Sequence, residues 1–195
     1  MKTRRAVFLD RDGTLSEDVG YPGEFRQVHI YPGAFEAVRL LRGAGFAAVV
    51  ITNQSGVGRG YFDEEDLRAL HARFLETFAR RGAPLDGLYH CPHVPGPSVG
   101  PECSCGKPRP GLAIQAAREL DLKLRECYMI GDKIEDILFA LNIGAVPVLV
   151  LTGYGRASRR DLAARGVRPA HVAVGVLEAA TWILERGRPA GHDPL

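Results

Sequence analysis

Short apolar runs alternate along the chain with stretches that carry apolar residues at helical spacing. The runs have the length of strands buried on both faces, and they cover residues 6–9, 46–51, 88–90, 127–130, 146–151 and 171–174. The amphipathic stretches predict helices over residues 32–43, 63–80, 110–120, 134–144, 159–165 and 177–184. Strands that alternate with helices predict a parallel sheet in a doubly wound α/β fold.

Several predicted helices carry their own start residues. Asp63 is placed to cap the second helix, and the acids that follow it favour the positive end of the helix dipole. Pro110 suits the first position of the third helix, where the missing N–H does no harm. Helical spacing predicts that the first, second and fourth helices bury Phe35, Val38, Leu40 and Leu41; Leu67, Leu70, Phe74 and Phe78; and Ile134, Ile137, Leu138 and Leu141.

Composition then limits the class of protein. The 195 residues are expected to form one domain, and 23 glycines with 13 prolines predict long structured loops. No apolar run reaches the roughly 18 residues of a membrane span, and the N-terminus lacks a signal-peptide core, so we expect a soluble cytoplasmic protein. With 25 basic and 23 acidic residues, a small-molecule partner is expected rather than a nucleic acid or a membrane.

Polar residues follow three of the predicted strands at the point where each strand ends. Asp10 and Asp12 follow the first strand, Thr52 and Asn53 end the second, and Asp132 follows the strand over 127–130. Any one of these residues alone is most often an ordinary turn former. Because open parallel sheets bind ligands at the carboxyl ends of their strands, the coincidence of three strand ends predicts a common site.

The acids at these strand ends require a cation. Asp10, Asp12, Asp132 and Asp136 would crowd together, and unit charges 4 Å apart repel by roughly 4 kcal/mol at an effective dielectric constant of 20. Carboxylate clusters of this kind favour Mg²⁺, and Lys107 could add positive charge. The set suits phosphoryl transfer, in which one aspartate attacks phosphorus and the other handles the proton of the leaving group.

Three cysteines and a histidine form a second candidate metal site. Cys91 and His93 are followed, after nine intervening residues, by Cys103 and Cys105, which is a complete tetrahedral set for structural Zn²⁺. The loop over residues 91–111 is rich in proline and glycine, so it needs a staple to stay ordered. The alternatives are a disulfide, which the cytoplasm disfavours, or unrelated surface thiols.

Four motifs in order give the sequence a family resemblance. Residues 10–15 (DRDGTL), 51–53 (ITN), Lys107 and 131–136 (GDKIED) resemble the phosphatases of the haloacid dehalogenase (HAD) superfamily. Within it, residues 8–13, 52–61, 91–93, 103–108 and 131–133 resemble the heptose-bisphosphate phosphatase and histidinol-phosphatase family, and the likeness runs from Val7 to Gly155. The resemblance implies a HAD-like fold without a large cap domain, in which the zinc loop covers the site. Because the loop then does the work of a cap, we expect a monomer.

The resemblance also implies roles for the matched residues. Asp10 would be the nucleophile and a Mg²⁺ ligand, while Asp12 would be the general acid and base and offer its backbone carbonyl to Mg²⁺. Asp132 would be a further ligand, with Asp136 outside direct coordination. The phosphate- and substrate-binding residues would be Thr52, Asn53, Arg59 and Lys107. Arg59 would reach the far end of the substrate, although a solvated loop arginine explains it equally well.

One departure leaves the substrate open. The family usually carries an arginine before the motif lysine, and this chain has Gly106, with Arg109 at a different position. We therefore expect a heptose 1,7-bisphosphate, with histidinol phosphate or another small phosphomonoester as the alternative. The alternative outside enzymes is a zinc-bearing nucleic-acid-binding module that uses the arginines from Arg156 onward. These arginines are scattered without interleaved aromatics, which favours solvated helix faces instead.

Overall fold

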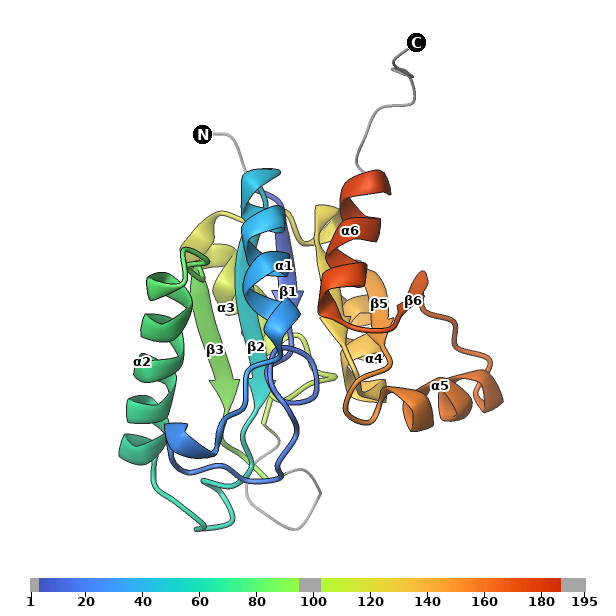
Figure 1. The fold of residues 1–195 in the computed structure, drawn as a ribbon. Helices are drawn as coiled ribbons and strands as arrows, with labels where there is room; N and C mark the ends of the chain where they lie inside the picture. The colour runs from blue at the N-terminus through green and yellow to red at the C-terminus, as the bar shows by residue number, and fades with distance from the viewer. Residues whose placement is uncertain (1–3, 95–102, 187–195) are drawn as a thin grey trace.

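Six parallel strands form one sheet in the order β3-β2-β1-β4-β5-β6 (Figure 1). The computed structural model describes residues 4–94 and 103–186. The strands are β1 Ala6–Leu9, β2 Ala47–Asn53, β3 Gly87–Cys91, β4 Tyr128–Gly131, β5 Val146–Val150 and β6 His171–Ala173. Every neighbouring pair is parallel, which confirms the doubly wound α/β prediction.

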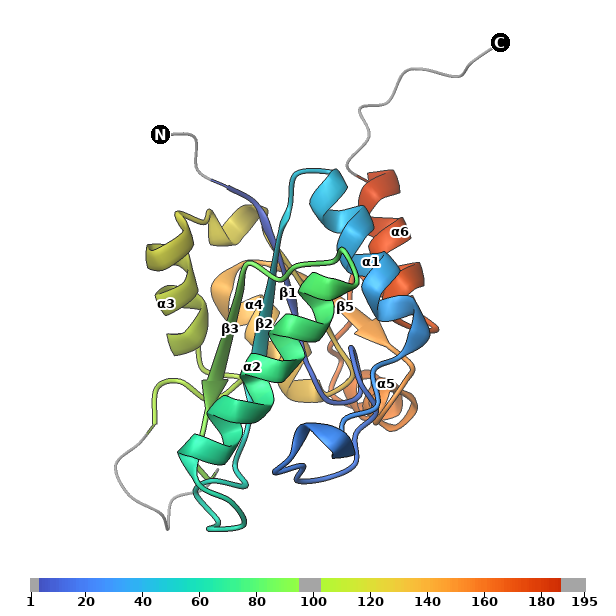
Figure 2. The same ribbon diagram turned by 60° about the vertical axis from the view of Figure 1, so that its left-hand side comes forward.

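Helices cover both faces of this sheet (Figure 2). They are α1 Pro32–Gly43, α2 Glu64–Arg80, α3 Gly111–Leu120, α4 Ile134–Ile143, α5 Gly155–Ala164 and α6 Val176–Arg186, with short 3-10 turns at η1 Phe25–Gln27 and η2 Leu124–Glu126. Helices α1, α2 and α6 share a core with one face, and α3 and α4 share a core with the other. Helix α5 packs against α4 through Leu162 and Ile137.

The central strand shows why its sequence is continuously apolar. All four residues of β1 are fully buried. Val7 and Leu9 belong to the core under α1, α2 and α6, whereas Ala6 and Phe8 belong to the core under α3 and α4. Since successive strand residues point to opposite faces, a strand covered on both sides has no position for a polar side chain until it ends.

All of the predicted strands and helices are present, with local differences at their ends. Helix α5 begins four residues before the predicted start at 159, and Pro110 precedes α3 as its cap instead of opening it. Leu40 and Leu141, predicted to be buried, are exposed. The buried face of α1 runs through Val38 and Leu41, which turns Leu40 outward. Within residues 4–94 and 103–186, no helix combines the length and apolar character needed to cross a membrane.

The chain reverses its direction of winding beside β1. It runs outward from β1 through β2 to β3, and then returns to place β4 on the other side of β1. In open α/β sheets such a switch point leaves a crevice between the carboxyl ends of the two strands. Asp10 directly follows β1, and Asp132 directly follows β4, so the topology brings these acids to one place.

The cap of α2 provides a test of the fold. Asp63 Oδ1 accepts hydrogen bonds from the backbone N–H groups of Glu65 (2.8 Å) and Asp66 (2.9 Å). Asp63→Ala removes this acceptor and is expected to lower the free energy of unfolding by about 1 kcal/mol, as measured by urea denaturation. Asp63→Ser keeps a capping oxygen and should retain most of the stability. Equal losses in the two variants would show that the cap is not what stabilises this end of the helix.

Candidate active site

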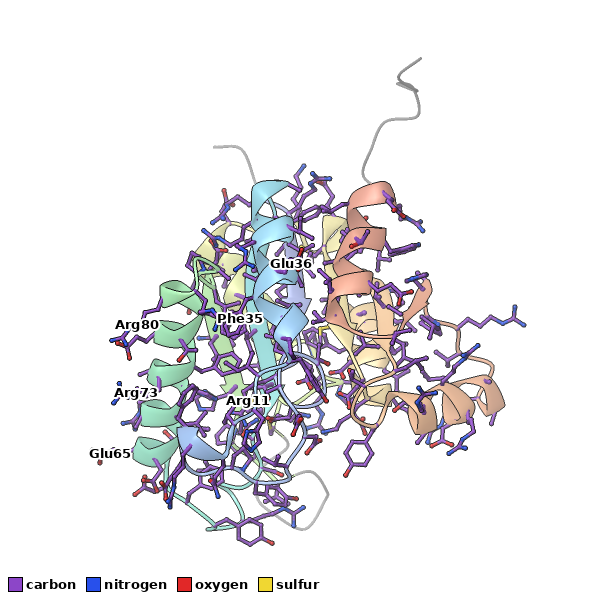
Figure 3. The ribbon with its side chains drawn as sticks, viewed as in Figure 1. Arg11, Phe35, Glu36, Glu65, Arg73 and Arg80 are labelled. Carbon is purple, nitrogen blue, oxygen red and sulfur yellow. The ribbon has the colours of Figure 1, made fainter. Side chains whose placement is uncertain are left out.

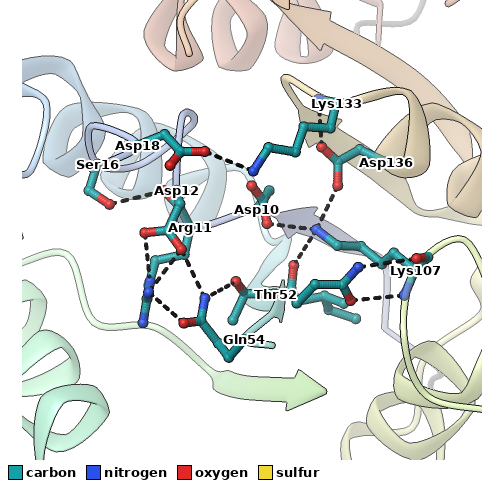
Figure 4. Close-up of polar contacts among 12 residues, drawn as sticks. Asp10, Arg11, Asp12, Ser16, Asp18, Thr52, Gln54, Lys107, Lys133 and Asp136 are labelled. Atoms are coloured by element: carbon teal, nitrogen blue, oxygen red, sulfur yellow. Dashed lines mark hydrogen bonds and ion pairs between the residues drawn. The ribbon is translucent and has the colours of Figure 1, made fainter. Parts of the chain in front are cut away.

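Most of the residues predicted for the active site line a cleft at the carboxyl edge of the sheet, and Figure 4 shows the polar contacts among them. The cleft has a volume of about 610 Å³. Its walls include Asp10, Asp12, Thr52, Asn53, Lys107 and Asp136, together with Lys133, Tyr154 before α5 and Asp161 in α5. Residues from three strand ends and from the loop before α3 therefore meet in one cavity, as the strand-end pattern predicts.

Three buried carboxylates gather around one buried lysine. Asp10, Asp132 and Asp136 each have a carboxylate oxygen within 4.8 Å of the others. Lys107 Nζ lies 2.6 Å from Asp10 Oδ1 and 2.6 Å from Asp136 Oδ1, and it also donates to the backbone carbonyl of Ile51 at 2.9 Å. The Asp12 side chain is not part of this group. It faces Arg11 and Gln54 instead.

Glycines leave the space that these carboxylates occupy. A Cβ on Gly13 or on Gly153 would lie 2.2 Å from Asp132 Oδ2, and both glycines have positive φ angles. A Cβ on Gly131 would likewise lie 2.2 Å from Asp136 Oδ2. The acids can approach one another because these three backbone positions carry no side chain.

Burial sets the protonation of the cluster. It raises the pKa of Asp10 to about 6 against the opposing charge of Lys107. Burial, together with the charges of Asp10 and Asp136, raises the pKa of Asp132 to about 8. Burial alone would lower the pKa of Lys107, but the contacts with Asp10 and Asp136 raise it above its ordinary value. The lysine is therefore an ammonium ion, and the acids carry charge only at a cost in free energy.

The cluster has the properties of a divalent cation site. Asp132 Oδ1 is buried and has no hydrogen-bond partner in the described part of the chain. Asp136 differs, because its two oxygens accept from Lys107 Nζ and from the backbone N–H of Lys133. Carboxylate oxygens suit Mg²⁺, whose charge would offset the repulsion between the acids. The residues present therefore fit a magnesium ion held mainly by Asp10 and Asp132.

Asn53 ties the lysine loop to β2. Its Oδ1 accepts from the backbone N–H of Lys107 at 2.9 Å, and its Nδ2 donates to the backbone carbonyl of Lys107 at 3.1 Å. Thr52 Oγ1 accepts a hydrogen bond from Gln54 Nε2 at 2.8 Å. Arg59 is exposed outside the cleft, with its guanidinium 5.8 Å from the ring centre of Tyr21, a residue on the cleft wall.

The four predicted zinc ligands lie together beside this site. Cys91 Sγ lies 3.3 Å from Cys103 Sγ and 3.5 Å from His93 Nδ1, while Cys105 Sγ lies 3.0 Å from Cys103 Sγ and 3.4 Å from His93 Nδ1. The three cysteines are free thiols, so this structure does not contain the disulfide alternative. Residues 95–102 of the predicted loop lie outside the described residues. The cluster could hold a zinc ion.

Several polar residues of the site were not predicted as candidates. Arg11, Gln54 and His71 form a buried network behind Asp12, and Lys133 Nζ lies 2.8 Å from Asp18 Oδ2. In Figure 3, Arg11 lies between α2 and the carboxyl end of the sheet. In the sequence, Arg11 has no distinguishing feature except its place between two aspartates. The partner on α2 could not be identified without the fold.

The raised pKa of Asp132 predicts an unusual pH dependence. A carboxyl group whose pKa is higher in the folded chain binds more protons there, so its contribution to stability is lost as the pH rises from 3.8 towards about 8. Metal-free protein should therefore lose stability relative to Asp132→Asn between about pH 5 and pH 8, by up to about 1.4 kcal/mol per pH unit. Urea denaturation in a chelator measures this difference.

Magnesium provides the control for that experiment. It should restore stability to the unsubstituted protein at pH 8 and have much less effect on Asp132→Asn, because charge neutralisation is what the ion supplies. If the denaturation midpoints of the two proteins in the chelator change with pH in parallel, the raised pKa does not belong to Asp132.

Comparisons with known proteins agree with this geometry. A HAD-hydrolase-like family model matches residues 104–179. A D-glycero-beta-D-manno-heptose-1,7-bisphosphate 7-phosphatase from Yersinia pestis is 47% identical over 153 residues, which cover 76% of this chain and 81% of that protein. The D-glycero-D-manno-heptose-1,7-bisphosphate 7-phosphatase from Thermosynechococcus vestitus is 37% identical over 187 residues, or 92% and 95% of the two chains.

A solved structure extends the agreement to the whole fold. The crystal structure of D,D-heptose 1,7-bisphosphate phosphatase from B. bronchiseptica, complexed with magnesium and phosphate, has a TM-score of 0.82 and 33% identity. The match covers 94% of this chain and 99% of that one. Together with the acid and lysine cluster, these similarities confirm the resemblance seen in the motifs: the chain belongs to the D-glycero-D-manno-heptose-1,7-bisphosphate 7-phosphatase family of HAD-like hydrolases.

Proposed function

We propose that the chain is a Mg²⁺-dependent phosphatase that removes the 7-phosphate of D-glycero-D-manno-heptose 1,7-bisphosphate. The observation that carries this proposal is the 2.6 Å contact between Lys107 Nζ and Asp10 on the cleft wall, beside the buried Asp132, whose Oδ1 has no hydrogen-bond partner in the described part of the chain. A nucleophilic carboxylate, an ammonium group and a cation site on one cavity are what phosphoryl transfer to an aspartate needs. The names of the family members support the choice of substrate.

In the first half of the proposed reaction, Asp10 attacks phosphorus. A bond forms between an Asp10 oxygen and phosphorus, the bond from phosphorus to the sugar oxygen breaks, and Asp12 gives that oxygen a proton. Lys107, Thr52 and Asn53 are proposed to bind the phosphoryl oxygens, with Lys107 offsetting their charge. The products of this half are the sugar with a free hydroxyl at position 7 and an aspartyl phosphate on Asp10.

In the second half, water replaces the aspartate. Asp12, now deprotonated, takes a proton from a water molecule that attacks the phosphorus of the aspartyl phosphate. The acyl phosphate bond breaks, which releases inorganic phosphate and restores the Asp10 carboxylate. The sum of the two halves is hydrolysis of one phosphate ester, with Asp12 returned to its protonated form.

We propose that Asp10, Asp132 and the backbone carbonyl of Asp12 hold the magnesium ion, with Asp136 outside direct coordination. The two contacts that already occupy the Asp136 oxygens support this division. When bound, the ion offsets the negative charge of the carboxylates and of the phosphoryl group. Arg59 is proposed to meet the far end of the substrate, since Tyr21 connects it to the cleft wall.

We propose that the cysteine and histidine cluster holds a structural zinc that positions Lys107. Gly106 N donates to Cys103 Sγ at 3.3 Å, one residue before the lysine. A Cβ at position 106 would lie 3.1 Å from Cys91 Sγ, so the glycine allows the loop to approach the cluster closely. Gly106 also stands where the family usually carries an arginine, and Arg109 lies at a different position, in a groove along α3.

We further propose that residues 1–195 act as one domain and as a monomer in the cytoplasm. A single sheet links the described residues, and four free thiols suit a reducing compartment. Small phosphorylated sugars, and not nucleic acids or membranes, are the proposed partners.

The nucleophile and the acid can be told apart by substitution. Asp10→Asn should abolish release of inorganic phosphate from heptose 1,7-bisphosphate, whereas Asp12→Asn should lower kcat by about 10²- to 10⁴-fold. Glu65→Gln, on the exposed side of α2 (Figure 3), is the control and should keep full activity. Circular dichroism checks that each variant is folded. Steady turnover by folded Asp10→Asn would exclude the covalent route.

The same assay tests the substrate. Histidinol phosphate and sugar monophosphates are compared with the bisphosphate, each with and without Mg²⁺. A higher kcat/KM for histidinol phosphate would overturn the assignment of the sugar, and turnover that does not respond to Mg²⁺ would overturn the metal.

The zinc proposal predicts a different pair of results. Cys103→Ser should lower zinc content by about one equivalent per chain and lower the Tm, because the loop loses its staple. Cys127→Ala is the matched control, since Cys127 is a buried thiol away from the cluster. It should lower the Tm without changing the zinc content. Elemental analysis that finds the same zinc content in Cys103→Ser and the unsubstituted protein would refute the site.

A further inference from the structure

Arg11 is a charged side chain that the fold buries completely. It follows Asp10 directly and has no exposed surface, and it is the largest fully buried side chain among the described residues. Neither Arg11 nor its neighbour His71 lines the cleft. A buried guanidinium is tolerated only where its N–H groups are satisfied, so the partners of Arg11 show what it does.

The guanidinium contacts both carboxylate oxygens of Asp12 (Figure 4). Arg11 Nε donates to Asp12 Oδ1 at 3.0 Å, and Arg11 Nη2 donates to Asp12 Oδ2 at 2.8 Å. Nη2 also donates to Gln54 Oε1 at 2.8 Å. A planar, two-bond contact of this kind fixes the rotation of the carboxylate as well as its position.

His71 anchors the other end of the guanidinium. Arg11 Nη1 lies 2.9 Å from His71 Nε2. Because a guanidinium has no lone pair to accept with, Nε2 must be the acceptor, and the imidazole carries its proton on Nδ1. Burial, and then the charge of Arg11 and the neighbouring ring of His90, lowers the pKa of His71 to about 2. The histidine therefore stays neutral and keeps its acceptor.

Gln54 completes the network on the cleft side. Its Nε2 donates to Asp12 Oδ2 at 2.8 Å and to Thr52 Oγ1 at 2.8 Å. The amide orientation follows from its partners, since the opposite orientation would turn oxygen to the carboxylate and nitrogen to the guanidinium. Thr52 accepts in this contact, which leaves its hydroxyl proton available to the cleft.

We propose that Arg11, anchored by His71, is a positioning residue that holds Asp12 in the geometry for proton transfer to the leaving group. The inference rests on the proposed function, because it assumes that Asp12 moves the proton. It assigns a role to two residues that touch neither the acid cluster nor the cleft. A substitution at His71 reaches the reaction through Arg11 and its contacts with Asp12, and an effect carried instead by Gln54 and Thr52, or by the neighbouring His90, would damage phosphate binding or the loop.

The choice of substrate separates positioning from a general structural effect. A sugar alkoxide is a poor leaving group and needs the proton from Asp12, whereas p-nitrophenolate leaves without one. Misplacement of Asp12 should thus slow the sugar phosphate while leaving the first step with p-nitrophenyl phosphate nearly unchanged. Loss of folded protein, or damage to the metal or phosphate sites, would slow both substrates together.

The test uses three variants of His71 in the 195-residue chain with Mg²⁺ and zinc. His71→Leu removes the acceptor and leaves a guanidinium N–H unpaired, and His71→Asn does the same with a polar side chain that is too short to reach. His71→Gln returns an acceptor at a similar reach. Circular dichroism and the Tm establish which variants are folded, and Asp12→Asn provides the reference behaviour.

For heptose 1,7-bisphosphate, kcat should fall about tenfold or more in His71→Leu and His71→Asn, with KM within about twofold. The burst rate of p-nitrophenolate release should stay within about twofold, and His71→Gln should recover most of kcat. An unchanged kcat in a folded Leu or Asn variant, or an equal fall with both substrates, would overturn the positioning role. Failure of the proposed function looks different, since the unsubstituted protein would then not hydrolyse heptose 1,7-bisphosphate.

Discussion

The site is organised by the contact of one buried ammonium group with two buried carboxylates. Lys107 Nζ lies 2.6 Å from both Asp10 and Asp136, and all three side chains are almost completely buried. Removing such charges from water is unfavourable unless they are paired and hydrogen-bonded. Among the described residues, the third carboxylate, Asp132, forms no such ion pair, and its pKa is raised first by burial and then by the charges of Asp10 and Asp136. A divalent cation is the group that would offset these charges, so the same imbalance that destabilises the metal-free site favours metal binding.

This contact depends on parts of the fold that lie far apart in the sequence. Asp10 is fixed by β1, Asp136 by the first turn of α4, and Lys107 by a loop with no regular structure. Two features hold the loop in place: a pair of hydrogen bonds between Asn53 and the backbone of Lys107, and the cysteine and histidine cluster. Loops are normally the least ordered parts of a domain. Here the lysine can be placed accurately because its backbone is held between a strand end and a candidate metal centre.

Much of this arrangement followed from the sequence, for physical reasons that also mark the limit. Strand ends could be located because apolar runs stop abruptly at Asp10 and Asp132, and parallel topology then brings them together. The ligands of the candidate zinc site could be found because metal coordination restricts residue type and spacing. By contrast, Leu40 was placed on the buried face because apolar spacing does not define which face the sheet covers. The start of α5 was misplaced as well, since the helix begins at Gly155. The contact of Arg11 with His71 spans 60 residues, and no local pattern encodes it.

Asp10 and Asp12 differ in their surroundings more than in their chemistry. Side chains two residues apart beyond a strand end can diverge, and these two carboxylates enter separate charged networks. Asp10 faces Lys107 and the other acids, where its charge is opposed by burial and its pKa rises. Asp12 faces Arg11 and Gln54, which hold its orientation from outside the acid cluster. A nucleophile needs to approach phosphorus beside the cation, whereas a proton carrier needs to stay off the cation. The two networks thus suit one short motif to the two roles proposed for it.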